Sequence, residues 1–143
     1  MHALPVLAIT MGDPASIGPE IGVKALLQEK IHAICRPLLV GDAAVFQQII
    51  DKLQLKAKLN PVHNVADSKF DLGTIDVFDL NITDISKLEF GKIDAMCGEA
   101  SFQAVKKAIE LAISGEVDGT VTGPINKKSI NEARYSQFDG FLH

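Results

Sequence analysis

Short apolar runs alternate along this chain with segments of helical periodicity, and this alternation limits the possible folds more than any other feature. The apolar run at residues 4–11 ends at Gly12-Asp13-Pro14, which is typical of a buried strand followed by a turn. Residues 16–29 then carry apolar side chains at helical spacing, and residues 37–41 form a second apolar run. The order strand, helix, strand predicts an α/β domain with a largely parallel sheet.

The middle of the chain continues the alternation. Asp42 is predicted to cap a helix, because its side chain can accept a hydrogen bond from the first turn. The inward face of that helix is predicted to carry Val45, Ile49 and Leu53. A short strand is predicted within residues 55–65, ending before Asn60-Pro61, and further strands are predicted at residues 74–80 and 117–122.

A long amphipathic segment follows in the last third of the chain. It is predicted to form a helix that begins at Gly98 and stops at Gly115, since glycine commonly follows the last turn of a helix. The inward face is predicted to carry Phe102, Val105, Ile109, Ala112 and Ile113. A shorter helix is predicted at residues 126–133.

Composition excludes several classes of protein. The chain has 143 residues, of which 47% are hydrophobic, so it is expected to fold as one globular domain rather than remain disordered. The net charge is −4 and no basic cluster occurs, which argues against nucleic-acid binding. No apolar run is long enough to span a membrane and no signal peptide is recognised, so a cytoplasmic location is expected. Cys35 and Cys97 are expected to be free buried thiols, although one disulfide is the alternative.

A glycine-containing turn follows the first predicted strand. Gly12 and Asp13 lie where the strand meets a helix, and ligands of open α/β sheets gather at such strand ends. Glycine lets the backbone approach a ligand, and the Asp13 carboxylate could accept a hydrogen bond from a substrate hydroxyl. The alternative is a structural turn in which Asp13 caps the helix. The spacing of the glycines is not that of a dinucleotide-binding fingerprint.

A second turn of this kind follows the last predicted strand. Thr122 and Asn126 offer uncharged hydrogen-bonding groups on either side of Gly123, and Lys127 offers a positive charge. A lysine beside a glycine turn suits a phosphate or a carboxylate. The alternative is a pair of solvated lysines after a turn. The four histidines lie far apart without ligand spacing, so no metal site is predicted within this chain.

Together these segments resemble a known family. Residues 9–21, Gly91-Lys92 followed by Gly98, and residues 121–127 are similar, in the same order, to segments of the 4-hydroxythreonine-4-phosphate dehydrogenases of pyridoxal phosphate biosynthesis. Full-length members are more than twice as long. Residues 1–143 are therefore expected to be the N-terminal part of a two-lobed α/β dehydrogenase whose C-terminal part is absent.

The resemblance implies a fold and an activity. The fold would have three layers around a mostly parallel sheet, as in isocitrate and isopropylmalate dehydrogenases, and the full-length protein would be a homodimer. The enzyme would use NAD or NADP and a divalent metal (zinc, magnesium or cobalt), with metal ligands outside this chain. It would oxidise the secondary hydroxyl of 4-phosphohydroxy-L-threonine, a phosphorylated hydroxy acid, and the resulting 3-keto acid would lose CO₂.

The resemblance also suggests site residues, although it identifies no catalytic residue. Substrate-binding residues are expected to be Asp13, Thr122, Asn126 and Lys127, with Lys127 as the first choice for the substrate anion. Gly12 and Gly123 are expected to form the turns that line the cleft.

The sequence departs from the family pattern at three places, and two other functions stay open. Ser16 and Arg134 stand where the family has glycine, and the family's His-Thr-Glu segment after Gly140 is missing, with His143 not its counterpart. The short chain alone is therefore expected to be inactive. One alternative is a paralogous erythronate or threonate 4-phosphate dehydrogenase, which the segment 98–108 resembles more closely. The other is a non-catalytic remnant that binds a phosphorylated ligand or dimerises.

Overall fold

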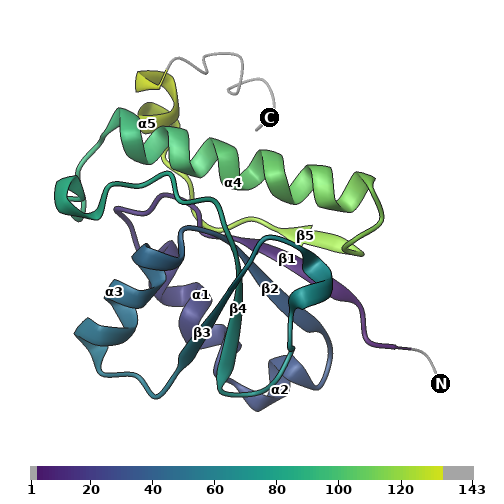
Figure 1. Ribbon diagram of the computed structural model, residues 1–143. Coiled ribbons are helices and arrows are strands. Elements are labelled where there is room, and N and C mark those ends of the chain that lie inside the picture. The colour runs from purple at the N-terminus through teal and green to yellow at the C-terminus, as the bar shows by residue number, and fades with distance from the viewer. Residues whose placement is uncertain (1–2, 134–143) are drawn as a thin grey trace.

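The computed structural model describes residues 3–133, and these form a five-stranded parallel sheet with helices on both faces (Figure 1). All neighbouring strands run parallel, in the order β3-β4-β2-β1-β5. The strands are β1 (Val6–Thr10), β2 (Arg36–Gly41), β3 (Lys58–Val62), β4 (Thr74–Asp79) and β5 (Gly119–Val121). The predicted α/β fold is thereby confirmed, while Arg134 and the segment that follows it lie outside the described residues.

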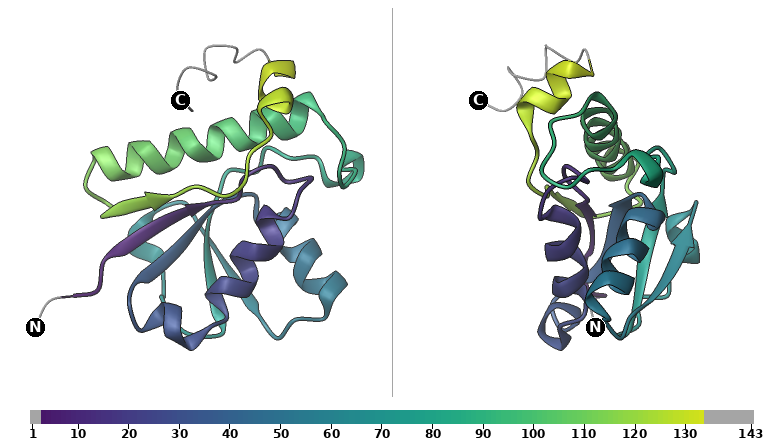
Figure 2. Two further views of the ribbon diagram at one scale, coloured as in Figure 1. Left: turned by 180° about the vertical axis from the view of Figure 1, so that it is seen from behind. Right: turned by 90° about the vertical axis from the view of Figure 1, so that its left-hand side faces the viewer.

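The helices make the two outer layers of the fold. They are α1 (Gly18–Leu26), α2 (Glu29–His32), α3 (Ala43–Leu53), α4 (Ala95–Ile113) and α5 (Lys127–Glu132), with short 3-10 helices at Val65–Asp67 and Ile85–Lys87. Figure 2 shows that α1 and α3 cover one face of the sheet, whereas α4 crosses the opposite face and carries α5 on its far side. The three-layer arrangement is therefore present in this chain. No helix among residues 3–133 is both long and apolar enough to cross a membrane.

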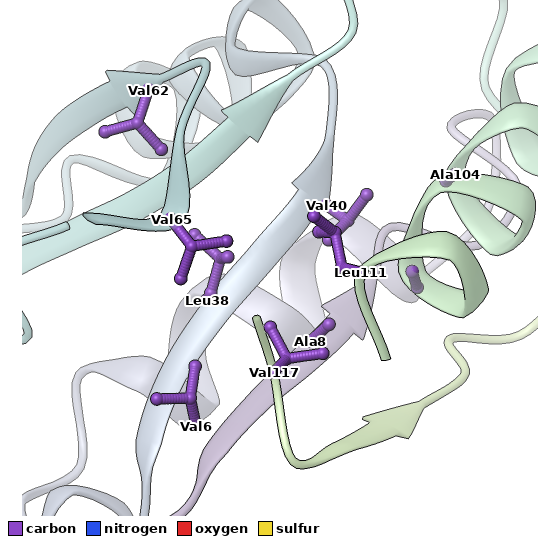
Figure 3. Close-up of a cluster of buried hydrophobic side chains, with 10 residues drawn as sticks. Val6, Ala8, Leu38, Val40, Val62, Val65, Ala104, Leu111 and Val117 are labelled. Carbon is purple, nitrogen blue, oxygen red and sulfur yellow. The ribbon is translucent and has the colours of Figure 1, made fainter. Parts of the chain in front are cut away.

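Two hydrophobic cores fill the space on the two faces. The core under α1 and α3 contains large side chains, including Phe46, Leu26 and Leu39. The core under α4 instead combines strand valines with small helix residues such as Ala104 and Ala108 (Figure 3). The small side chains let α4 lie close to the sheet, so most of the large side chains in this core come from the strands and their loops.

The sequence prediction for α4 was wrong in its start and partly wrong in its inward face. The helix begins at Ala95, one turn before Gly98, because Asp94 caps it by accepting a hydrogen bond from the backbone N–H of Met96 at 2.7 Å. Ile113 is 82% exposed, and the residues that meet the sheet are Ala104, Ala108 and Leu111, although Val105 is buried as predicted. Periodicity weights large apolar residues, and here the largest ones point beside the sheet and not onto it. The stop at Gly115 is confirmed, with φ +80°.

The prediction for α3 was displaced by one position. Val45 is buried as predicted, but Phe46 and Ile50 complete the buried face, and Leu53 is 37% exposed. Asp42 occupies the capping position, yet its carboxylate accepts hydrogen bonds from the backbone N–H groups of Ile82 and Thr83 and not from its own helix. This aspartate therefore ties a distant loop to the end of β2.

The strand β3 runs through Asn60-Pro61, where the sequence had suggested that a strand would end. Proline is tolerated there because β3 is an edge strand, so its missing N–H can face away from the sheet. Cys35 and Cys97 are free and buried, which confirms the preferred interpretation over a disulfide.

The neighbouring strands β1 and β5 determine where a ligand could bind. Both carboxyl ends reach the same edge of the sheet, because the two strands are parallel. The chain leaves β1 toward α1 on one face and leaves β5 toward α5 on the other face (Figure 1). Adjacent strands whose connections go to opposite faces leave a crevice between them, which is the common ligand site of open α/β sheets.

Candidate functional site

The loops that follow β1 and β5 are locked together by two hydrogen bonds. The backbone N–H of Asp13 donates to the carbonyl oxygen of Pro124 at 2.8 Å. In the other direction, the N–H of Gly123 donates to the side-chain hydroxyl of Thr10 at 2.9 Å. Because both glycine-containing turns take part, the two motifs that the sequence places 110 positions apart form one structural unit.

Glycine is required in this unit for steric reasons. Gly12 has a φ of +73°, a left-handed conformation, and a Cβ atom there would overlap the carbonyl oxygen of Pro124. A Cβ atom on Gly123 would lie 2.6 Å from the carbonyl oxygen of Thr10. Gly18, at the start of α1, similarly has no room for a Cβ atom against Met11. The predicted turn glycines thus permit close contact between the two loops.

Asp13 is buried beneath this unit, with only 2% of its surface exposed. Its carboxylate accepts a hydrogen bond from the N–H of Ala15 at 2.8 Å and interacts with the hydroxyl of Ser129 on α5. Burial raises the pKa of Asp13 above its ordinary value of 3.8, and the nearby Asp94 carboxylate acts in the same direction. Asp13 closes its own turn, and α1 is preceded directly by Ile17, so Asp13 does not cap that helix.

Ser129 connects three elements, and the sequence reasoning missed it. Its hydroxyl accepts a hydrogen bond from the N–H of Asp94 at 3.2 Å, while it also interacts with Asp13. The backbone of Ser129 packs directly against Gly98, where a Cβ atom would overlap the serine carbonyl. The sequence analysis interpreted Gly98 as the start of the helix. A glycine in the first turns of a helix was instead the signal of this close contact.

A cavity of about 330 Å³ opens beside the locked loops. Asp13 and Ser16 line it from the loop after β1, and Asn126 lines it from the loop after β5. Phe90 and Lys92 complete it from the segment before α4. A volume of this size suits a small polar metabolite, and the mixture of acidic, basic and amide groups suits one with hydroxyl and anionic groups.

The segment before α4 is attached to the rest of the cavity by its backbone. The N–H of Gly91 donates to the carbonyl oxygen of Ala15 at 2.6 Å. The neighbouring Lys92 ammonium lies 3.7 Å from the Glu89 carboxylate, with both side chains more than half exposed. Sequence reasoning used Gly91-Lys92 only as part of the resemblance and did not select Lys92 as a site residue.

Ser16 and Asn126 help to hold the loops that line the cavity. The Ser16 hydroxyl donates a hydrogen bond to the carbonyl oxygen of Asp13 at 3.0 Å. The same hydroxyl accepts a longer hydrogen bond from the N–H of Gly18, at 3.5 Å. The serine that replaces the family glycine is therefore accommodated without strain. Asn126 caps α5, because its side-chain oxygen accepts from the N–H of Ser129 at 3.0 Å.

The structure separates the predicted substrate-binding residues into two groups. Asp13 and Asn126 line the cavity of 330 Å³. Thr122 instead lines a smaller cavity of about 90 Å³ together with Thr10 and Val105. Lys127 is exposed and is not among the residues that line the larger cavity. Thr122 and Lys127 follow β5 as predicted but are not among the residues that line the cavity of 330 Å³.

Among residues 3–133, neither a thiolate nucleophile nor a metal centre is found near the site. Burial raises the pKa of Cys97 to about 12, and the carboxylates of Asp13 and Asp94 add to the shift, so the thiol stays protonated at neutral pH. Among residues 3–133, no group of three or more His, Cys, Asp or Glu side chains could hold a metal ion. The described residues can bind and orient a ligand through hydrogen bonds and one ammonium group.

Comparison with known proteins gives consistent matches. The family of the pyridoxal phosphate biosynthetic protein PdxA matches residues 33–142. A protein of Symbiobacterium thermophilum, provisionally named a D-threonate 4-phosphate dehydrogenase, is 47% identical over 94% of this chain and 40% of its own length.

Solved structures of similar proteins give the same result. A 4-hydroxythreonine-4-phosphate dehydrogenase from Burkholderia phymatum has a TM-score of 0.87 and 37% identity, covering 91% of this chain and 39% of that one. The corresponding enzyme from Klebsiella pneumoniae has a TM-score of 0.86 and 32% identity, with 92% and 40% covered. The chain thus spans about 40% of the length of the relatives that it matches.

Proposed function

This chain belongs to the family of the pyridoxal phosphate biosynthetic protein PdxA, and from that membership we propose that it forms the N-terminal part of a dehydrogenase for a phosphorylated hydroxy acid. The likeness to the Burkholderia phymatum enzyme, which extends over 91% of this chain, carries the proposal. The cavity beside β1 and β5 supports it, because its polar lining suits hydroxyl and anionic groups.

Two branches of substrate fit this proposal. The first is 4-phosphohydroxy-L-threonine, as in the name of the solved structures. The second is threonate 4-phosphate or erythronate 4-phosphate, and the names of the curated relatives favour it, with identities of 47% and 42% in Symbiobacterium thermophilum and Clostridium botulinum. Because those names describe the relatives, the two substrates must be compared directly in an assay.

The proposal includes groups that the described residues do not supply. The enzyme would use NAD or NADP and a divalent ion such as zinc, magnesium or cobalt, which would polarise the hydroxyl under oxidation. Residues 3–133 offer no set of ligands that fits such an ion, so its ligands are proposed to lie elsewhere in a full-length protein. A homodimeric assembly and a cytoplasmic location also belong to the proposal.

Within the proposed reaction, the described residues bind and orient the substrate. Asp13 can accept a hydrogen bond from a substrate hydroxyl while the Ala15 N–H and the Ser129 hydroxyl hold its carboxyl group in place. Asn126 uses its oxygen in capping α5, so its NH₂ group is the part that can donate to the ligand. Such fixed donors and acceptors hold a substrate in one orientation without the cost of ordering them on binding.

An activity assay tests the proposal. The 143-residue chain is compared with a chimera in which it replaces the matching 40% of the Symbiobacterium thermophilum relative. Both are assayed for reduced nicotinamide with NAD and NADP, with added divalent metal and with each phosphorylated acid or its dephosphorylated form. We expect turnover from the chimera on the phosphorylated acids and none from the chain alone.

Two results would contradict these expectations. Full-rate turnover by the short chain would show that its catalytic centre is complete. A folded chimera without turnover on any of the acids would refute the dehydrogenase proposal, and ligand binding by such a chimera would favour the alternative of a non-catalytic binding protein.

A further inference from the structure

Lys92 is the basic residue among those that line the cavity of 330 Å³. The other charged residue in the lining is Asp13, which comes from the loop after β1. A cavity that admits an anionic ligand needs a positive charge to offset the desolvation of that anion. Lys127, which the sequence favoured for this role, is not in the lining.

The backbone at Lys92 is fixed beside the cavity, but the Lys92 ammonium makes no strong ion pair. The hydrogen bond from Gly91 to Ala15, at 2.6 Å, fixes the backbone beside it. Its only recorded ion pair within residues 3–133 is with Glu89 at 3.7 Å, and the two side chains are 54% and 68% exposed. An exposed pair of this kind contributes little, so the ammonium group can turn to a ligand at small cost.

Two other residues of the lining are suited to hydroxyl groups. Asp13 offers a carboxyl group that is buried and fixed by Ala15, and Asn126 offers its NH₂ group. A hydroxy acid with an anionic group at one end would therefore meet acceptor and donor groups and an ammonium in the same cavity.

We propose that Lys92 binds the anionic oxygens of the ligand in this cavity, with Asp13 and Asn126 contacting its hydroxyl groups. The anionic group is a phosphate monoester or a carboxylate, since a lysine ammonium pairs with either. The substrate class rests on the proposed function, whereas the assignment of Lys92 rests on the cavity. Lys92 thereby replaces Lys127 as the anion-binding residue of this chain.

Direct binding to the 143-residue chain tests the assignment. Backbone amide NMR titrations are recorded with inorganic phosphate, with glycerol 3-phosphate and with glycerate, which together separate the phosphate, the hydroxylated phosphate and the hydroxylated carboxylate. The variant Lys92→Gln removes the charge, and Lys92→Arg keeps it. Lys87→Gln is a matched control, because Lys87 lies in the same segment, pairs with Asp84 at 4.0 Å and is outside the cavity lining.

We expect Lys92→Gln to weaken the binding of at least one of the three anions by about tenfold or more, since it removes a charge-assisted hydrogen bond. Lys87→Gln and Lys127→Gln should stay within about twofold of the original chain. Lys92→Arg should recover most of the affinity. The anion with the largest loss identifies whether the phosphate or the carboxylate meets Lys92.

Three results would overturn the assignment. In the first, Lys127→Gln loses binding while Lys92→Gln binds as the original chain does. In the second, all variants bind with equal affinity. In the third, the original chain binds none of the anions. Because the readout is binding by the chain alone, it is independent of turnover by the chimera. A chimera without activity whose N-terminal part still binds anions through Lys92 would refute the proposed function and leave this assignment intact.

Discussion

The two sides of the cavity are built in opposite ways. On one side, the buried loop after β1 interlocks with the partly exposed loop after β5, and Gly12, Gly98 and Gly123 have no room for a side chain. On the other side, the segment with Gly91 and Lys92 is exposed, and a Cβ atom on Gly91 would meet nothing within 4 Å. One side is fixed by packing between distant elements, and the other is attached to it by the backbone hydrogen bond from Gly91 to Ala15.

This difference separates residues that hold the site from residues that meet the ligand. Substitutions in the interlocked side should change the free energy of unfolding, because they disturb backbone contacts between distant elements. Substitutions in the exposed segment should change stability much less, and the substitution of Lys92 should change binding. The following substitutions test that separation, in order of decreasing expected effect.

The largest effect is expected for Gly12→Ala. The left-handed φ of +73° costs alanine about 1 kcal/mol, and the overlap with the carbonyl of Pro124 adds about 3 kcal/mol. Urea unfolding should show a loss of about 4 kcal/mol. The matched control is Gly91→Ala, whose φ is +82° in open space and which should lose only about 1 kcal/mol. Equal losses in the two variants would refute the steric explanation.

The next largest effect is expected for Gly98→Ala, and the change in the free energy of unfolding has an unusual sign. Alanine in place of glycine within a helix normally stabilises by about 1 kcal/mol. Here the new methyl group would overlap the backbone of Ser129 and cost about 3 kcal/mol, which leaves a net loss of about 2 kcal/mol. Gly22→Ala in α1 is the control, because its nearest neighbour is the flexible end of Leu39 at 3.2 Å. Stabilisation of both variants would show that α5 does not pack against Gly98.

Ser129→Ala should have a smaller effect. The substitution removes the acceptor for the N–H of Asp94 and a hydrogen-bond partner of Asp13, which should cost about 1.5 kcal/mol. Ser114→Ala removes a hydroxyl that also makes hydrogen bonds but lies at the exposed end of α4, and should change stability by less than about 0.5 kcal/mol. Thermal unfolding of both variants gives the comparison, and a neutral Ser129→Ala would contradict the bridging role.

The smallest effect is expected for Asp13→Asn, which should change how the stability of the folded chain depends on pH. The folded chain holds the Asp13 proton more tightly than the unfolded chain, because burial raises the pKa above 3.8. This group therefore makes stability fall as the pH rises from about 3.8 through the folded-state pKa. Asp13→Asn should remove that part of the decline, seen as Tm measured against pH.

Asp84→Asn provides a control of opposite sign for this experiment. The hydroxyl and the backbone N–H of Ser86 lower the pKa of Asp84, so its contribution is present above pH 3.8 and is lost as the pH falls through the folded-state pKa. Identical pH profiles for Asp13→Asn and the original chain would show that Asp13 is not perturbed in the folded state.

Much of the fold could be predicted from local sequence, but the faces of its helices could not. The strands at residues 74–80 and 37–41 were located closely, because apolar runs bounded by turn residues are local signals. The inward face of α4 was partly misjudged, because small residues such as Ala104 and Ala108 pack closely against the sheet. Large residues such as Ile113 are exposed instead. Periodicity cannot distinguish a face that packs closely through small residues from one that packs through large residues.

The candidate site shows the same division. Gly12, Asp13, Gly123 and Asn126 were recognisable from turn chemistry at strand ends, and the structure brings the two turns together. Lys127 was selected because it follows a glycine turn in the sequence, and Lys92 was not considered for this role. The direction of a lysine side chain depends on the path of its backbone, and that path is set by contacts with other elements.

The sequence by itself determined the α/β class, the parallel strands and the two glycine turns, because apolar periodicity and turn chemistry act over a few residues. Only the tertiary structure decided that Ser129 joins α5 to Asp13 and Asp94, and that Lys92 lines the cavity. These contacts link residues 35 or more positions apart. They arise when the parallel sheet brings the ends of β1 and β5 together, which no local pattern specifies.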